Sequence, residues 1–193
     1  MFIQVIQAKS DRHDEVRALM HEWAEMPDDG SGFLGATYGF TDDDDFLGVI
    51  RFESKEKAMA NSARPETDAM AKRMAELMDA PPTFYDCNDV TVWREGGSDD
   101  AGFVQIIQGK TDDPAGLKET MSADSDDFRQ ERPDIIGGTF ALTDDGTFIN
   151  TVAFTDEASA REGEKKSSPP EDMMSLMRDV KYFDLRDPWF ASA

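Results

Sequence analysis

Residues 2–9 read FIQVIQAK and residues 103–110 read FVQIIQGK, so the chain contains the same strand-like stretch twice. Four positions of each six-residue core are identical, and the other two exchange isoleucine and valine. Apolar and β-branched residues occupy both alternating side-chain positions, which predicts a strand buried on both faces. Each copy also carries one glutamine on each face, and a buried amide needs a hydrogen-bond partner.

The likeness between the two halves extends along nearly the whole chain. Seven residues of the first half recur 102 positions later: Gly35, Thr37, Thr41, Asp42, Asp43, Phe46 and Phe52. Later matches have spacings of 105 and then 98 residues, so the second helix of the second half should be about two turns shorter. The pattern predicts a tandem duplication, with a first repeat at residues 1–95, a linker at 96–102 and a second repeat at 103–193.

The first repeat predicts six elements in the order β-α-β-β-α-β. Apolar residues spaced three and four apart indicate helices, and alternating or continuous apolar runs indicate strands. Prolines mark where the helices end or are interrupted. The expected elements are strand 2–9, a helix ending before Pro27, strands 33–41 and 46–53, a helix from Ser54 to Met78 interrupted at Pro65, and strand 83–94.

This order is the ferredoxin-like split unit, in which both helices cover one face of an antiparallel sheet. The other face of the sheet is apolar as well, so it must also be buried. We therefore predict an α+β chain of two ferredoxin-like repeats whose sheets pack face to face as an intrachain dimeric α/β barrel. Such a chain is a monomeric pseudo-dimer, and the sequence leaves further self-association open.

The composition limits the partners of the protein. The 193 residues include 41 Asp and Glu but only 20 Lys and Arg, a formal net charge of -21. Such a surface disfavours nucleic acid and anionic membranes, and it fits either ordinary solvation or adaptation to high salt. With Cys87 as the one cysteine and no apolar run of about 18 residues, we expect a cytoplasmic protein without disulfides or membrane spans.

Three segments carry a resemblance to a known family. They are the strand at residues 2–9, the hairpin at 35–52, and residues 52–66, which read FESKEKAMANSARPE. Together they resemble the dimeric α/β-barrel superfamily, in particular the antibiotic-biosynthesis-monooxygenase (ABM) domain family and its two-repeat actinobacterial members. The superfamily includes cofactor-independent oxygenases of polycyclic phenols, heme-degrading enzymes, isomerases and proteins with no known reaction, so fold alone does not select an activity.

The resemblance implies an apolar pocket for a small hydrophobic aromatic ligand. It favours a cofactor-independent monooxygenase acting on an aromatic or quinol-type molecule. The alternative is a non-catalytic, stress-related or ligand-binding α/β barrel, whose polar amides are structural.

In the oxygenase hypothesis, amide, phenol and guanidinium groups would steady a substrate phenolate while oxygen reacts with the electron-rich ring. The catalytic candidates are Gln7, Gln108, Tyr38 and Arg51. For the glutamines, the alternative is pairing with backbone or with the other repeat. Tyr38 stands where the second repeat has Phe140, so its hydroxyl distinguishes the two halves.

Four further residues are candidates for the lining of a pocket: Gln4, Gln105, Trp93 and Asp124. Trp93 ends a predicted strand, where it would either line a pocket mouth or pack at an edge. Asp124 stands at the position equivalent to Trp23, so a carboxylate replaces an indole on the expected apolar stripe of a helix. That replacement predicts either a distorted helix or a polar opening.

His13 and His21 are the only histidines, and neither recurs in the second half. Heme-degrading relatives need an iron-ligating histidine on or near the second helix, and residues 22–193 contain none. Heme is therefore disfavoured, and the scarcity of His and Cys also disfavours a metal site built from them. We expect neither a cofactor nor a metal.

Overall fold

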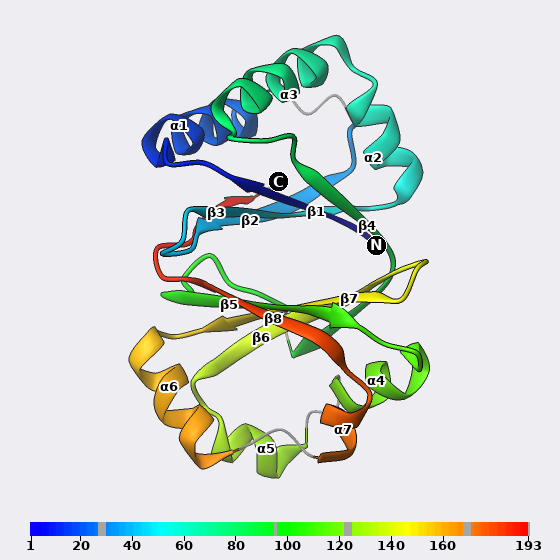
Figure 1. Cartoon of the computed structure of the whole chain (residues 1–193), viewed down its shortest axis with the longest axis vertical. Coiled ribbons are helices and arrows are strands. Elements are labelled where there is room, and N and C mark those ends of the chain that lie inside the picture. Colours follow the sequence, from blue (N-terminus) through cyan, green and yellow to red (C-terminus); the bar gives the residue numbers. More distant parts are fainter. Residues whose placement is uncertain (27–29, 95, 122–124, 168–170, 193) are drawn as a thin grey trace. The chain divides into compact units, whose positions relative to one another are not determined.

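The computed structural model describes residues 1–26, 30–94, 96–121, 125–167 and 171–192 (Figure 1). The chain forms two compact units, one comprising Met1–Asn88 with Trp189–Ala193 and the other Asp89–Pro188. The predicted α+β class is confirmed, and the order β-α-β-β-α-β occurs twice along the chain. The packing of one repeat against the other, the repeat boundaries and the linker stay predictions.

The first unit is an antiparallel sheet with three helices on one face (Figure 1). Its strands lie in the order β4-β1-β3-β2-β9, so the strand that opens the chain is central. The bounds are β1 (Phe2–Lys9), β2 (Phe33–Phe40), β3 (Asp45–Phe52), β4 (Thr83–Arg94) and β9 (Trp189–Ser192), with helices α1 (His13–Ala24), α2 (Lys55–Ser62) and α3 (Pro65–Leu77).

Local sequence explains where these helices begin and end. Helix α1 buries Val16, Leu19 and Met20 and ends three residues before Pro27. The Ser54 hydroxyl accepts a hydrogen bond from the Lys57 amide and caps α2. Pro65 is the first residue of α3, where its missing N–H breaks no helical hydrogen bond.

The second unit repeats this arrangement with shorter helices. Its strands lie in the order β8-β5-β7-β6-β4, and α7 has 5 residues where α3 has 13, which confirms the predicted loss of about two turns. The bounds are β5 (Phe103–Lys110), β6 (Ile135–Thr143), β7 (Thr147–Phe154) and β8 (Arg178–Leu185), with helices α4 (Pro114–Met121), α5 (Asp126–Glu131), α6 (Glu157–Lys166) and α7 (Glu171–Ser175).

The two hairpins share an irregularity that the sequence matches anticipate. The β2–β3 register shifts between Phe33 and Gly35, and the β6–β7 register shifts between Ile135 and Gly137. Gly35 has φ +135°, a backbone conformation that other residues rarely adopt. The recurring glycine therefore marks the same bulge in both repeats.

Two strands connect the halves in a way that the sequence does not reveal. The first part of β4 pairs with β1, whereas the residues of β4 from Asp89 onward belong to the second unit, where β4 lies next to β6. Strand β9 follows the second repeat, yet it pairs with β2 and completes the sheet of the first unit. Each repeat thus contributes one strand segment to the other unit.

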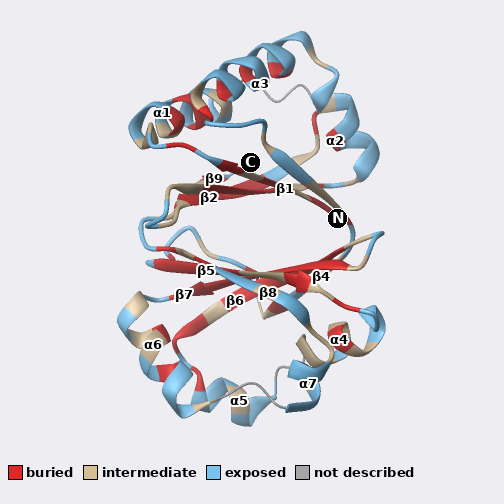
Figure 2. Cartoon of the chain, viewed as in Figure 1, coloured by how far each residue is buried: buried red, intermediate tan, exposed pale blue. Residues whose placement is uncertain are grey.

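The opening strand is buried on both faces, as predicted (Figure 2). On the helix-covered face, Phe2 and Ile6 pack into a core with the apolar stripes of α1 and α3. On the opposite face, Ile3 and Val5 are each 1% exposed. Both faces of β1 therefore carry buried apolar residues, with half-buried Gln4 on one face and half-buried Gln7 on the other, which explains why the stretch carries no clear polar face.

Candidate ligand pocket of the first repeat

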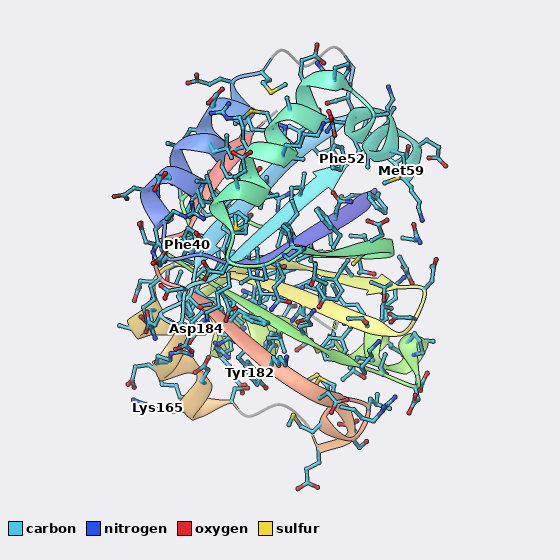
Figure 3. All side chains as sticks on the ribbon, turned by 45° about the horizontal axis from the view of Figure 1, so that its top comes forward. Phe40, Phe52, Met59, Lys165, Tyr182 and Asp184 are labelled. Atoms are coloured by element: carbon cyan, nitrogen blue, oxygen red, sulfur yellow. The ribbon has the colours of Figure 1, made fainter. Side chains whose placement is uncertain are left out.

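A cavity of about 660 Å³ lies within the first unit, between its sheet and helices α1 and α3. This volume is in the range of pockets that bind small molecules, roughly 300–1,000 Å³. The wall is mostly apolar and rich in aromatic and sulfur-containing side chains, including Met20, Trp23, Phe33, Phe52 and Met74. Phe52 is labelled in Figure 3, at the end of β3.

The strands select which side chains reach the cavity. Side chains alternate between the two faces of a sheet, so on the regular strands β1 and β3 only one parity lines it. On β1 the lining residues are Gln4 and Ile6, and on β3 they are Ile50 and Phe52. The polar candidate on this face of β1 is therefore Gln4.

Tyr38 lies on β2 at the edge of the cavity. Its register partner on β3 is Gly48, and a Cβ atom there would lie 3.1 Å from Tyr38 Cδ1, so glycine gives the phenol ring its room. The ring is 7% exposed and stacks on Trp189 at a centroid distance of 5.7 Å. Tyr38 is therefore held by packing on both sides.

Burial raises the pKa of Tyr38 to about 12, and the nearby positive charge of Arg51 opposes this only in part. The phenol is consequently protonated at neutral pH and can donate a hydrogen bond. Among the residues that the structure describes, none is hydrogen-bonded to its hydroxyl.

Gln4 is held from the neighbouring strand. Its Nε2 donates to Asp86 Oδ1 at 2.9 Å, and since a carboxylate only accepts, the nitrogen end of the amide must face Asp86. This bond fixes the orientation of an amide that borders the cavity. The partner that the sequence analysis required for a buried glutamine is thus an aspartate on β4.

Gln7 and Arg51 lie on the opposite face of the same sheet. The Tyr85 hydroxyl donates to Gln7 Oε1 at 3.3 Å, and Arg51 Nη1 donates to Thr37 Oγ1 at 3.1 Å. Neither residue lines the cavity. The structure therefore brings Tyr38 and Gln4 to one pocket and leaves Gln7 and Arg51 outside it, and their catalytic roles stay predictions.

The remaining candidates belong to the second unit. Gln105 is 7% exposed, and its Nε2 donates to Asp184 Oδ1 at 3.0 Å. Gln108 is half-buried and occupies the other alternating side-chain position of β5. Trp93 packs in an apolar cluster with Phe103. Asp124 lies outside the described residues. The roles proposed for these residues stay untested.

Sequence reasoning missed the contribution of α3. Thr67 and Arg64 both line the cavity, and Thr67 is 6% exposed, with no hydrogen-bond partner for Oγ1 among the residues that the structure describes. Thr67 lies three and seven residues before Met70 and Met74, which are buried on the same helix. A hydroxyl on an apolar helical stripe was the signal available in the sequence.

Two further observations bear on the class of protein. Within the described ranges, no three His, Cys, Asp or Glu side chains are grouped as ligands for a metal ion. No helix in the described part of the chain is long and apolar enough to cross a membrane.

The fold and the cavity define an α+β protein with two ferredoxin-like repeats, the first of which holds a pocket of small-molecule size. No protein-family model matches the sequence, and no curated protein matches it. Solved structures do match. A proposed monooxygenase from Fusobacterium nucleatum superposes with a TM-score of 0.75 at 9% identity, over 99% of this chain and 94% of the other.

Two more solved structures share the fold. An anthrone oxidase-like protein has a TM-score of 0.62 at 12% identity, over 100% of this chain and 94% of the other. A heme-degrading enzyme from Listeria monocytogenes has a TM-score of 0.50 at 11% identity, over 98% and 99%. The resemblance is therefore confirmed at the level of fold: the chain has the ferredoxin-like fold of ABM-related proteins.

Proposed function

We propose that the protein binds a flat, largely apolar aromatic molecule in the pocket of the first repeat and oxidises it with molecular oxygen. The observation that carries this proposal is the Tyr38 phenol, which is buried, protonated at neutral pH and part of the wall of a mostly apolar cavity. The shared fold with a proposed monooxygenase and an anthrone oxidase-like protein supports it.

The pocket provides both shape and polarity for such a ligand. Trp23, Phe33 and Phe52 offer aromatic surfaces on which a flat ring system can stack. The Tyr38 hydroxyl would donate to a phenolic or keto oxygen of the ligand. Because a donor stabilises the anion of a phenol more than the neutral form, this bond would lower the pKa of the ligand.

The proposed chemistry needs molecular oxygen as its only co-reactant. For an anthrone-type substrate, the ring CH₂ loses a proton to water at the pocket mouth, and the resulting carbanion transfers an electron to oxygen. Recombination forms a carbon–oxygen bond, and the peroxide then loses water to give a carbonyl group. One substrate and one oxygen molecule become one quinone and one water, so atoms and electrons balance.

A second function is ligand binding without oxidation. It is favoured because the strands place no carboxylate in the cavity wall that could act as a base beside Tyr38. The lining residues with ionic side chains are Arg64, Asp68 and Lys72, all on α3 or immediately before it. None of the strand residues that line the cavity is a carboxylate. A base beside Tyr38 would therefore have to be water.

The test uses a variant that fills the pocket and a matched control. Ala71 and Ala69 are both exposed residues of α3, but only Ala71 lines the cavity. We expect Ala71→Trp to abolish binding of anthrone, measured by fluorescence titration, and to abolish oxygen consumption with anthrone. Ala69→Trp should behave as the wild type in both measurements.

The outcomes separate the two functions. Oxygen uptake that disappears in Ala71→Trp supports the oxygenase. Anthrone binding without oxygen uptake above the spontaneous rate leaves the binding function and rejects the oxygenase. Equal binding by wild type and Ala71→Trp would show that the pocket is not the site.

A further inference from the structure

The Gln4 side chain borders the cavity with one end of its amide already engaged. Its Nε2 donates to Asp86 Oδ1 at 2.9 Å, and the two residues are register partners that join β1 to β4. An ionised carboxylate accepts hydrogen bonds and donates none, so a reversed amide would lose this bond and set its oxygen against the carboxylate. The nitrogen end therefore stays on the side of β4, and Oε1 points away from β4.

The oxygen end of the same amide is available to a ligand. Within the described part of the chain, Oε1 accepts no hydrogen bond, and it is accessible to water. Gln4 lines the cavity together with Ile6, which lies two residues further along the same face of β1. A ligand that reaches this oxygen must offer it an O–H or N–H, because an amide oxygen only accepts.

The equivalent amide of the second repeat is covered by a side chain. Gln105 donates to Asp184 at 3.0 Å and also lies 3.5 Å from a Glu164 oxygen on α6. Counting from the helix caps, the counterpart of Glu164 on α2 is Ser62, which lines the cavity and donates its hydroxyl to a backbone carbonyl of its own helix. The same glutamine–aspartate pair is therefore covered by protein in one repeat and borders a cavity in the other.

A polar group of opposite character lies across the sheet. Tyr38 lies on β2 and Gln4 on β1, and their register partners on the intervening strand β3 are Gly48 and Ile50. From the spacing of strands and the rise along them, the Cα atoms of Gln4 and Tyr38 are about 12 Å apart. The wall thus offers a phenol that can donate on one side of a flat ligand and an amide oxygen that accepts on the other.

We propose that Asp86 is a positioning residue, which holds the Gln4 amide with its oxygen toward the cavity, and that this oxygen selects ligands with a neutral O–H or N–H at the edge opposite Tyr38. Donation to a carboxylate polarises the amide and strengthens its oxygen as an acceptor. The charge of Asp86 also disfavours an anion beside Gln4, so the ligand oxygen that becomes anionic lies at Tyr38. This inference rests on the proposed function and adds to it the orientation of the bound ligand.

The test uses two probes that differ in one hydrogen-bond donor. 2-Hydroxyanthracene donates and accepts, whereas 2-methoxyanthracene only accepts; both are titrated against the full-length protein by fluorescence. Gln4→Met keeps the length of the side chain but removes the amide. We expect it to weaken binding of 2-hydroxyanthracene about fivefold, which corresponds to about 1 kcal/mol, and to leave the affinity for 2-methoxyanthracene unchanged.

The matched control is Gln7→Met, which removes the glutamine on the opposite face of β1. Gln7 does not line the cavity, so this variant should change neither affinity.

Asp86→Asn tests the positioning role. An asparagine can donate to the Gln4 amide as well as accept from it, so the amide becomes free to present its N–H to the cavity. We expect 2-methoxyanthracene to bind more tightly than in the wild type and 2-hydroxyanthracene to bind less tightly, so that the ratio of the two affinities falls about fivefold. A merely structural role of Asp86 would change both affinities in the same direction.

Equal effects of Gln4→Met on the two probes would overturn the acceptor site, and an unchanged ratio in Asp86→Asn would overturn the positioning role. Both results leave the pocket intact if Ala71→Trp still abolishes anthrone binding. If anthrone and both probes fail to bind the folded wild type, the proposed function fails and this inference fails with it. Circular dichroism checks the fold of each variant, and because the two substitutions are independent, either one alone decides whether the amide reads the ligand.

Discussion

The two repeats use the same glutamine in different surroundings. Gln4 and Gln105 each donate to an aspartate on the neighbouring strand, Asp86 at 2.9 Å and Asp184 at 3.0 Å. Gln4 borders the cavity, whereas Gln105 is 7% exposed and also lies 3.5 Å from a Glu164 oxygen. The strands are therefore equivalent, and the difference lies in what the helices place above them.

In the second repeat, a helix places an arginine above the strand pair that carries Gln105 and Asp184. Arg161 of α6 donates to Asp184 and, at 3.0 Å, to Glu164, and its guanidinium lies 5.1 Å above the Phe103 ring. Counting from the helix caps, its counterpart on α2 is Met59, which is 40% exposed. Figure 3 labels Met59 on α2 and Asp184 on β8.

The second repeat also contains a buried ion pair. Arg132 Nη2 lies 2.8 Å from Asp134 Oδ2, and the two side chains are 8% and 6% exposed. The Arg132 guanidinium also lies 5.9 Å from the centre of the Phe154 ring, whereas the counterpart of that ring, Phe52, lines the cavity. In the second repeat, an ion pair thus lies beside a ring whose counterpart lines the cavity of the first repeat.

Removing Arg132 should break the buried ion pair of the second repeat and cause the largest loss of stability. We expect Arg132→Met to lower the free energy of unfolding by about 3–5 kcal/mol, because it leaves the Asp134 carboxylate buried without its partner. Guanidinium chloride unfolding followed by circular dichroism measures the change.

The matched control is Arg73→Met, which removes an exposed arginine paired with Glu22 and should leave the unfolding midpoint close to that of the wild type. The second variant Arg132→Met/Asp134→Leu removes both charges and should recover most of the lost stability. Equal midpoints for Arg132→Met and the wild type would show that the buried pair does not hold the second repeat together.

Alkaline pH should act on the first repeat through Tyr38, which has Phe140 as its counterpart. The pKa of Tyr38 rises from 10.0 to about 12 because burial disfavours the phenolate. Between these two values the unfolded chain releases the proton and the folded chain keeps it, so stability falls as pH rises. At about 1.4 kcal/mol per pKa unit, the loss reaches up to about 3 kcal/mol by pH 12.

Tyr38→Phe should remove this part of the loss. The Cys87 thiol, whose pKa burial also raises to about 12, is common to both proteins, so its effect cancels in the difference. The ultraviolet difference spectrum between wild type and Tyr38→Phe should show phenolate formation with a midpoint near pH 12. A midpoint near 10 would mean that Tyr38 is accessible to water.

Much of the fold follows from the sequence because it depends on local patterns. The doubled strand, the recurring Gly35 and Gly137, and Pro65 at the start of a helix each act within a few residues of themselves. Strand β9 could not be predicted in this way. Its four residues pair with β2, more than 150 positions earlier, and only the folded chain brings them together.

The pocket was predicted less well for a physical reason. Both parities of β1 are equally apolar, so alternation cannot tell which glutamine faces the helices. The structure places Gln4 on that face and Gln7 on the other. Tyr38 was singled out because its counterpart is Phe140, and it lines the cavity, but the cavity beside it depends on the helices and not on the strand.

The smallest effect should come from transferring the arginine of the second repeat to the first. Met59 is the counterpart of Arg161, and Asp86 is the counterpart of Asp184. Met59→Arg should therefore allow an ion pair with Asp86 like the one between Arg161 and Asp184. Since Asp184 and Arg161 are 26% and 32% exposed, we expect a coupling of only about 0.2–1 kcal/mol. A double-mutant cycle with Asp86→Asn measures it.

Ala60→Arg, at the next exposed position of α2, is the control and should show no coupling. A coupling of zero would show that the repeats differ by more than the side chains of their helices.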